Sequence, residues 1–388
     1  MDRKLATAAL ILGSTAVSLL LVEFALRLAV NPGDFLQIEP VPDPVLGHRI
    51  EPLQGGHDAL GFRNASVPTR ADIVALGDSQ TYGVGAPRDG SWPQQLGVLT
   101  GRSVYSMALG GYSPPDYLYL AQQVAPRLRP HQLIVGVYLG NDLLEACWAV
   151  QKRAYWARWR SSEAGDMCED GDERDIPEAP KRFGAARDWL SRHSVVYGVL
   201  KAALLSTAGK HEQRRAAAPG SPDQHFPWVD PAQPTVRTVF TPQARLMAMD
   251  VRRRGVREGL RIAKLVLTEV ATLARRNDES LLVVLIPTKE RVYCDHLRRA
   301  GISLPSAFGA LCSAEDRIKS DLLQQLSASD IAHVDVLVPL QLEVSRHVVL
   351  YPTDSDGHPR ASGYSVIARA VAAALPASGA RRSSIASP

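Results

Sequence analysis

The sequence predicts an α/β fold, a three-layer α/β/α sandwich in which a parallel five-stranded sheet lies between two layers of helices. Five short, mainly apolar runs stand out, and three of them (73–76, 133–138 and 282–286) consist almost wholly of Val, Ile, Leu and other apolar residues, which is typical of strands buried on both faces. Helical patterns separate several of these runs, as a parallel sheet requires. The 388 residues, 45% of them hydrophobic and 22% charged, suffice for one large domain with an insertion or for two modest domains.

The elements follow in order along the chain. The predicted strands are 73–76, 104–108, 133–138, 282–286 and 332–337. The predicted helices are 92–99, 116–124, a long helix that begins at Thr241-Pro242 and runs towards Arg276, and 362–375. We therefore expect one large domain over 71–376, with an insertion at about 147–241 where the alternation stops. The Pro- and Gly-rich segment 31–70 is expected to be an extended linker, and the tail 377–388 to be disordered.

The N-terminus has the pattern of a membrane helix. Residues 5–22 are apolar, and about 18 apolar residues are enough to cross the hydrocarbon core as a helix. Arg3 and Lys4 precede this run and favour a cytoplasmic N-terminus, with the rest of the chain on the far side. We expect residues 1–30 to be a retained single-pass anchor in an inner membrane, with a periplasmic domain. A cleaved signal peptide is the alternative.

Charge and cysteine content limit the partners. The formal net charge of +4 is small for this length and does not favour a nucleic-acid partner. The four cysteines form no CxxC pair or Cys/His cluster, so no metal site is predicted. An even number of cysteines in an exported domain fits two disulfides. Pairing of neighbours gives Cys147–Cys168 and Cys294–Cys312, although three connectivities are open on the sequence alone.

A candidate nucleophile follows the first predicted strand. Gly77-Asp78-Ser79 is a turn, made permissive by glycine, that presents the Ser79 hydroxyl above the sheet edge where a general base can approach it. In parallel sheets the chemistry collects at the carboxyl ends of the strands. Taken alone, such a turn is more often an ordinary helix N-cap.

Three further blocks lie at strand ends or near the C-terminus. Ser106–Gly111 follows the second strand, Gly140-Asn141-Asp142 follows the third, and Asp354-Ser355-Asp356-Gly357-His358 precedes the last helix. Together with the Ser79 turn, and in this order, they resemble the SGNH/GDSL hydrolase family. The resemblance covers about 73–375, interrupted by the insertion. It implies a flavodoxin-like sandwich and serine-based hydrolysis that needs no metal or organic cofactor.

The resemblance assigns roles to the motif residues. Ser79 is the expected nucleophile, and His358 is the expected general base, oriented by an aspartate. The backbone N–H groups of Ser79 and Gly111, with the side-chain amide of Asn141, are the expected oxyanion hole.

The aspartate departs from the commonest family pattern. Many members place it three residues before the histidine, where this chain has Ser355. Asp356, two residues before, resembles the Asp-x-His form of carbohydrate O-acetylation proteins and related esterases. We therefore expect Asp356 to orient His358, with Asp354 as the alternative. Lys289 follows the fourth strand, where it either contacts substrate or helps to cap its loop.

The expected function is hydrolysis of an acetyl or other short acyl ester through an acyl-serine intermediate. The expected substrate is an acylated small molecule or cell-envelope saccharide, and the membrane is a partner through the N-terminal helix. One alternative is an O-acyltransferase that uses the same triad. Another is a non-catalytic scaffold or binding protein with the SGNH fold. The intact set of Ser79, Gly111, Asn141 and His358 argues against the scaffold, because a binding protein needs no nucleophile with its base.

Overall fold

A five-stranded parallel sheet forms the centre of the molecule. The computed structural model describes residues 3–161, 168, 184–204 and 221–376. The sheet has the strand order β4-β3-β5-β8-β9, and all neighbours are parallel. Its strands are β3 (Ile73–Gly77), β4 (Val104–Ala108), β5 (Gln132–Tyr138), β8 (Ser280–Ile286) and β9 (Ala332–Asp335). The predicted fold class is confirmed, and each strand begins and ends within two residues of the predicted bounds.

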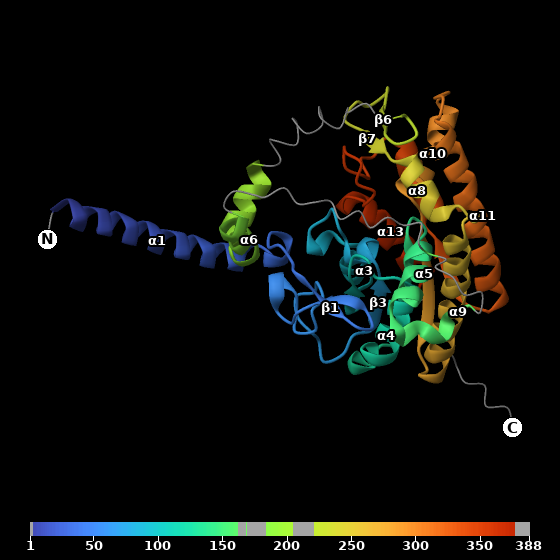
Figure 1. Ribbon diagram of the computed structural model, residues 1–388, viewed down its shortest axis with the longest axis horizontal. Coiled ribbons are helices and arrows are strands. Elements are labelled where there is room, and N and C mark those ends of the chain that lie inside the picture. Colours follow the sequence, from blue (N-terminus) through green and yellow to red (C-terminus); the bar gives the residue numbers. More distant parts are fainter. Residues whose placement is uncertain (1–2, 162–167, 169–183, 205–220, 377–388) are drawn as a thin grey trace.

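Helices cover both faces of the sheet (Figure 1). Alternate strand residues point to opposite faces, so Val74 and Leu76 join one apolar core while Ile73 and Ala75 join the other. The first core is completed by α4 (Pro114–Gln123), α5 (Asp142–Lys152) and α9 (Arg254–Arg276). The second is completed by α3 (Trp92–Thr100), α10 (Lys289–Arg299), α12 (Leu337–Ser345) and α13 (Ala361–Ala374). Residues of α11 (Ser306–Ala328) contribute to both.

The long helix predicted from Thr241 to Arg276 is wrong, because the chain forms two helices there. The first is α8 (Pro242–Met249), and α9 begins only at Arg254. Asp250 explains the break: its carboxylate accepts hydrogen bonds from the backbone N–H of Arg252, at 2.9 Å, and from the Arg252 guanidinium. Such local side-chain bonds offer the backbone an alternative to the helix.

The segment 31–70, expected as an extended linker, packs closely onto the domain. It contains a hairpin of β1 (Pro40–Asp43) and β2 (Gly47–Ile50), and it buries Leu46 and Phe62 in the first core. The Asn64 side chain hydrogen bonds to both the carbonyl oxygen and the N–H of Ser106 on β4, each at 3.0 Å. A polar side chain of this segment therefore bonds directly to the edge strand β4, a contact that the composition of the segment does not indicate.

The expected insertion at 147–241 falls partly outside the described residues, and the tail 377–388 lies wholly outside them. Cys147 lies within α5, so the core helix continues into this segment. The other described parts are a short 3-10 stretch (Ala154–Trp159), α6 (Gly184–His193), an apolar helix (Val195–Leu204) and a hairpin of β6 (Phe226–Val229) and β7 (Arg237–Phe240). Both predicted disulfides, Cys147–Cys168 and Cys294–Cys312, are present, and the second joins α10 to α11.

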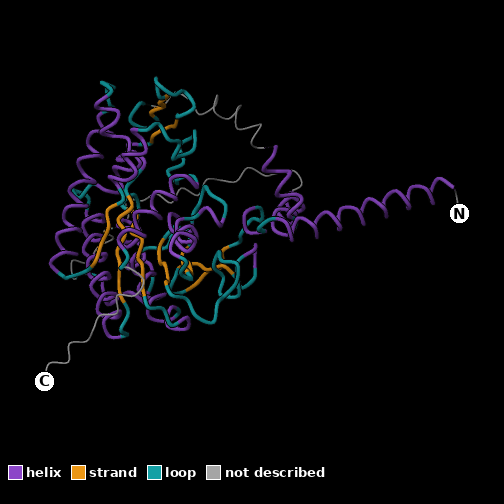
Figure 2. The backbone as a smooth tube through the Cα atoms, turned by 180° about the vertical axis from the view of Figure 1, so that it is seen from behind, coloured by secondary structure: helices purple, strands orange, loops and turns teal. Residues whose placement is uncertain are grey.

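The N-terminal helix α1 (Arg3–Ala29) projects away from the domain (Figures 1 and 2). Its stretch Ala6–Ala29 has a mean hydropathy of 2.1 and none of that window is buried, so its length and composition suit a membrane span. A signal sequence has the same properties. Together with the two disulfides, this helix indicates an extracytoplasmic location for the domain.

Candidate active site

Ser79 lies where the central strand β3 turns into a single helical turn, α2 (Ser79–Tyr82). Asp78 begins this turn, and its carboxylate accepts a hydrogen bond from the Gln80 N–H at 2.9 Å. Glycine is required at position 77, because a Cβ there would lie 2.1 Å from the Thr81 hydroxyl oxygen. The tight turn leaves Ser79 half-buried at the carboxyl edge of the sheet.

Ser79, His358 and Asp356 form a continuous hydrogen-bonded chain. The Ser79 Oγ lies 2.8 Å from His358 Nε2, and His358 Nδ1 lies 2.6 Å from Asp356 Oδ1. With the ring proton on Nδ1, His358 donates to Asp356, and Nε2 is free to accept the serine proton. The order of groups is that of a nucleophile, a base and an orienting acid.

Asp354 is exposed and takes a different place from Asp356. Its Oδ1 accepts a hydrogen bond from the Asp356 backbone N–H at 3.0 Å, so it shapes the loop and does not contact the imidazole. Burial alone would raise the pKa of Asp356, but hydrogen bonds from the ring and backbone of His358 hold it below its ordinary value. The positive charge of Lys289 acts in the same direction.

Lys289 lies beneath this loop and has no exposed surface, so the geometry does not favour the expected substrate contact. Its ammonium donates to the carbonyl oxygens of Asp356 at 2.8 Å and Asp354 at 3.1 Å. It also donates to Val239 O at 2.7 Å and to Thr238 Oγ1 at 3.1 Å, both on β7. Burial lowers the pKa of Lys289 to about 8. Lys289 thus connects the Asp356 loop to the hairpin of the inserted segment.

Lys289→Met is expected to lower the free energy of unfolding by about 3 kcal/mol, because it leaves buried carbonyl oxygens without a donor. It should also lower kcat at least about tenfold, since the Asp356 loop loses its support. Urea unfolding and ester turnover measure the two effects. Lys264→Met is the matched control, because Lys264 forms a partly exposed ion pair with Asp321 whose loss should cost less than about 1 kcal/mol. Equal losses in the two variants would contradict this role for Lys289.

Two of the expected oxyanion-hole donors come from neighbouring strand ends. Gly111 is exposed just beyond β4 and has φ +80°, a conformation that favours glycine. A Cβ on the preceding Gly110 would lie 3.7 Å from the Ser79 Cβ, so this turn lies against the nucleophile. Asn141 lies in the turn between β5 and α5, and its Nδ2 donates to Glu145 Oε1 at 2.7 Å. A primary amide carries two N–H groups, so a second donor is left for a ligand.

Carboxyl groups gather beneath the site. Burial raises the pKa of Asp78 to about 6, and burial together with the Asp78 charge raises the pKa of Glu145 to about 8. Asp142 is fully buried, and its carboxylate accepts hydrogen bonds from the Tyr138 N–H and the Tyr117 hydroxyl, each at 3.0 Å. Asp78 and Asp142 thus each accept a hydrogen bond from a backbone N–H of their own turn. No group of three or more potential metal-binding side chains occurs among the described residues.

Glu145→Gln is expected to reduce the pH dependence of stability. In the wild type the unfolded chain releases this proton near pH 4.5, whereas the folded chain holds it to about pH 8. The unfolded state therefore binds fewer protons in this window, and the free energy of unfolding falls as pH rises. The variant should gain about 3–4 kcal/mol relative to wild type between pH 5 and pH 8.

Urea unfolding at several pH values measures this gain. Glutamine retains the oxygen that accepts from Asn141, so folding should be preserved. Glu269→Gln, at an exposed ion pair on α9, is the control and should leave the slope unchanged. Parallel curves for wild type and Glu145→Gln would contradict the raised pKa.

Two residues near the expected oxyanion-hole donors were not predicted from the sequence to be part of the site. His48, from the supposed linker, lies with Nε2 2.8 Å from the Gly110 carbonyl oxygen, and burial lowers its pKa. Nothing in the local sequence around His48 indicates this contact. Glu145 stands four residues after Asn141 on a helix, and that spacing does predict side-chain contact.

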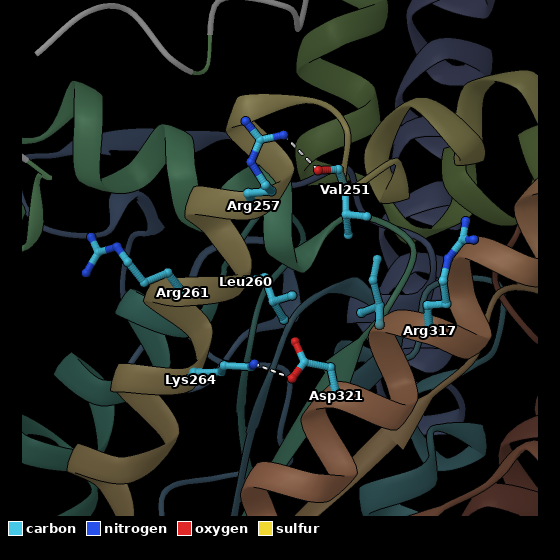
Figure 3. Close-up of a pocket in the computed structure, with 8 residues that line it drawn as sticks. Val251, Arg257, Leu260, Arg261, Lys264, Arg317 and Asp321 are labelled. Carbon is cyan, nitrogen blue, oxygen red and sulfur yellow. Dashed lines mark hydrogen bonds and ion pairs between the residues drawn. The ribbon is translucent and has the colours of Figure 1, made fainter. Parts of the chain in front are cut away.

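A groove of 540 Å³ lies elsewhere, between α9 and α11 (Figure 3). Most of its cations already have partners: Arg257 donates to the Val251 carbonyl oxygen, Arg261 pairs with Glu258, and Lys264 pairs with Asp321. None of the candidate catalytic residues lines it. We therefore assign it no part in the chemistry.

Comparison with known proteins gives only distant likenesses. No family model and no curated protein matches the sequence. A G-D-S-L family protein from Desulfitobacterium hafniense has a TM-score of 0.38 at 12% identity, covering 79% of this chain and 100% of that one. A catalytic mutant of an acetylxylan esterase from Geobacillus stearothermophilus has a TM-score of 0.37 at 10% identity, covering 79% and 95%. A GDSL-like lipase from Bacteroides thetaiotaomicron has a TM-score of 0.32 at 12% identity, covering 78% and 86%. Because these TM-scores are below 0.5, we base the function on the site's geometry.

Proposed function

We propose that this protein is a serine esterase that hydrolyses acetyl or other short acyl esters outside the cytoplasm. The observation that carries the proposal is the chain of hydrogen bonds from Ser79 through His358 to Asp356, at 2.8 and 2.6 Å. A binding protein has no need for a hydroxyl aligned with a base and an orienting acid. The backbone N–H of Gly111 and the side-chain amide of Asn141 are candidate oxyanion donors beside Ser79.

The proposed reaction has two steps. Ser79 Oγ attacks the ester carbonyl carbon while His358 Nε2 takes the hydroxyl proton. The C–O bond to the alcohol then breaks, and the alcohol leaves with that proton, which forms an acyl-serine. Water attacks the acyl-serine in the same way and releases the carboxylic acid and free Ser79. In each step the oxyanion is held by the N–H groups of Ser79 and Gly111 and by Asn141, each donor contributing about 3–4 kcal/mol.

The proposed substrate is an acylated saccharide or small molecule of the cell envelope. The support is the extracytoplasmic location that α1 and the two disulfides indicate. We further propose that α1 is retained as a single-pass anchor in the inner membrane and that the domain is periplasmic. Absence of the first 30 residues from the protein isolated from membranes, as read by N-terminal sequencing, would contradict the retained anchor.

A serine-reactive fluorophosphonate tests the nucleophile directly. The full chain should be labelled, Ser79→Ala should not, and Ser355→Ala should label as the wild type does, because Ser355 is an exposed serine of the His358 loop. Equal labelling of wild type and Ser79→Ala would reject the serine mechanism. No labelling of a folded wild type would favour a scaffold.

A second assay separates hydrolysis from transfer. The full chain is incubated with an aryl acetate, with and without an oligosaccharide, and the acetylated products are measured. Free acetate as the main product in both conditions is expected for the esterase. Acetyl-oligosaccharide as the main product would assign an O-acyltransferase that uses the same residues.

A further inference from the structure

The apolar helix Val195–Leu204 is buried at its start, where Val195 has no exposed surface, and is exposed towards its end. Leu200 is 57% exposed, and Lys201 is the only charged residue in the helix. A helix that is apolar on all sides belongs in a protein core or in lipid. In the sequence the apolar run from Val195 ends before Ser206, so at 1.5 Å per residue it spans about 16 Å as a helix, roughly half of the hydrocarbon thickness and too little to cross a bilayer. Its length and composition suit a helix that lies in the membrane interface.

This helix is fixed to the outer end of α1 by hydrogen bonds. The Glu23 carboxylate accepts from the Ser194 hydroxyl at 2.9 Å and from the backbone N–H groups of Val195 at 2.9 Å and Val196 at 3.0 Å. Glu23 therefore caps the first turn of the apolar helix, where a negative charge is favourable. Arg27 donates to the His193 carbonyl oxygen at 2.6 Å. Both side chains come from the last two turns of the candidate span Ala6–Ala29.

The preceding helix, α6, lies at the same level and carries residues typical of an interface. Figure 1 shows α6 across the domain-side end of α1. Trp189 is 60% exposed and stacks on His193 with ring centroids 5.0 Å apart. Tryptophan is enriched where membrane meets water. Arg187, two residues before Trp189, is exposed, and its positive charge suits contact with an anionic lipid headgroup. On α1 itself, Phe24 and Leu28 are also exposed.

We propose that α6 and the apolar helix lie in the outer headgroup region of the bilayer that α1 crosses, and hold the catalytic domain against the membrane surface. The occupant is lipid, because Glu23 and Arg27 fix the apolar helix to the domain-side end of the candidate span. Leu200 and Leu204 of this helix are exposed, as are Phe24 and Leu28 of α1. The proposal rests on the proposed membrane anchor and not on the esterase activity.

Site-specific fluorescence in the full chain tests the proposal. Both disulfides use up the four cysteines, so one added cysteine can carry an environment-sensitive nitrobenzoxadiazole probe. Leu200→Cys tests the interface, and Leu342→Cys on α12 is the matched control, with exposures of 57% and 50%. Leu12→Cys, 72% exposed within α1, reports the span. Each protein is reconstituted in phosphatidylcholine–phosphatidylglycerol vesicles that contain lipids spin-labelled either near the headgroup or deep in the acyl chain.

The expected result is at least threefold stronger quenching at Leu200 than at Leu342 by the shallow label, and quenching at Leu12 by the deep label. Quenching at Leu12 with equal values at Leu200 and Leu342 would overturn the interface proposal and leave the anchor standing. No quenching at Leu12 would overturn both. A Leu200 probe that is shielded from water but not quenched by either lipid would assign the surface to protein, and would also overturn the proposal. Ester turnover is measured separately, so its absence does not affect any of these outcomes.

Discussion

Ser79→Ala is expected to lower kcat for an aryl acetate by about 10⁴- to 10⁶-fold, the loss seen when a serine nucleophile that acts with its base is removed. The reason is geometric: His358 Nε2 lies 2.8 Å from the Ser79 Oγ, and the remaining hydrogen-bond donors cannot replace a covalent step. The measurement is steady-state hydrolysis by the full chain.

The variant should fold normally, because Ser79 is only half-buried. Urea unfolding checks this, and Ser355→Ala, in the His358 loop, should retain full activity. A Ser79→Ala protein that keeps more than about a tenth of wild-type kcat would reject the proposed nucleophile.

Asp356→Asn is expected to lower kcat by about 10⁴-fold, whereas Asp354→Asn should lower it less than about tenfold. An asparagine amide that donates to His358 Nδ1 would stabilise the tautomer with its proton on Nε2, and that tautomer cannot accept the serine proton. The Asp354 carboxylate accepts a hydrogen bond from the Asp356 backbone N–H, and asparagine keeps an acceptor for that bond. Similar losses in the two variants would mean that the loop conformation, and not the charge at Asp356, is needed.

Asp356→Asn is also expected to change how the free energy of unfolding depends on pH in acid. The pKa of Asp356 lies below its ordinary value, so its carboxylate stabilises the fold above about pH 4. That contribution is lost as pH falls through the folded pKa. Asp356→Asn should therefore show a weaker acid-induced loss of stability than the wild type. Unfolding curves between pH 2 and pH 6 measure this difference.

The sheet and the chemical motifs were predictable because both depend on short local patterns. Apolar runs identified all five strands, and the residues that follow them marked the edge where Ser79 and Asn141 lie. Asp356 was chosen over Asp354 from a two-residue offset. In the structure His358 Nδ1 lies 2.6 Å from Asp356 Oδ1, and Asp354 Oδ1 accepts from the Asp356 backbone N–H. Boundaries set by single side chains, such as the helix break at Asp250, were missed because an aspartate in a polar helix pattern does not by itself indicate a stop.

Other parts of the site depend on contacts between distant segments, and the sequence pattern does not contain them. Lys289 follows a strand, and that position is compatible with contact to substrate as well as with burial. Only the fold places its ammonium beneath carbonyl oxygens more than 60 residues further along the chain. His48 likewise reaches Gly110 from a segment whose composition indicated only turns.

The packing of Asn64 on Ser106 has a consequence for the solubility of shortened forms of the protein. β4 has a neighbour on one side only, and strands of this kind can pair with another chain and aggregate. Asn64 occupies both backbone groups of Ser106 and so blocks part of that exposed row. A shortened protein that starts at residue 71 would lose this protection, whereas one that starts near residue 31 would keep it.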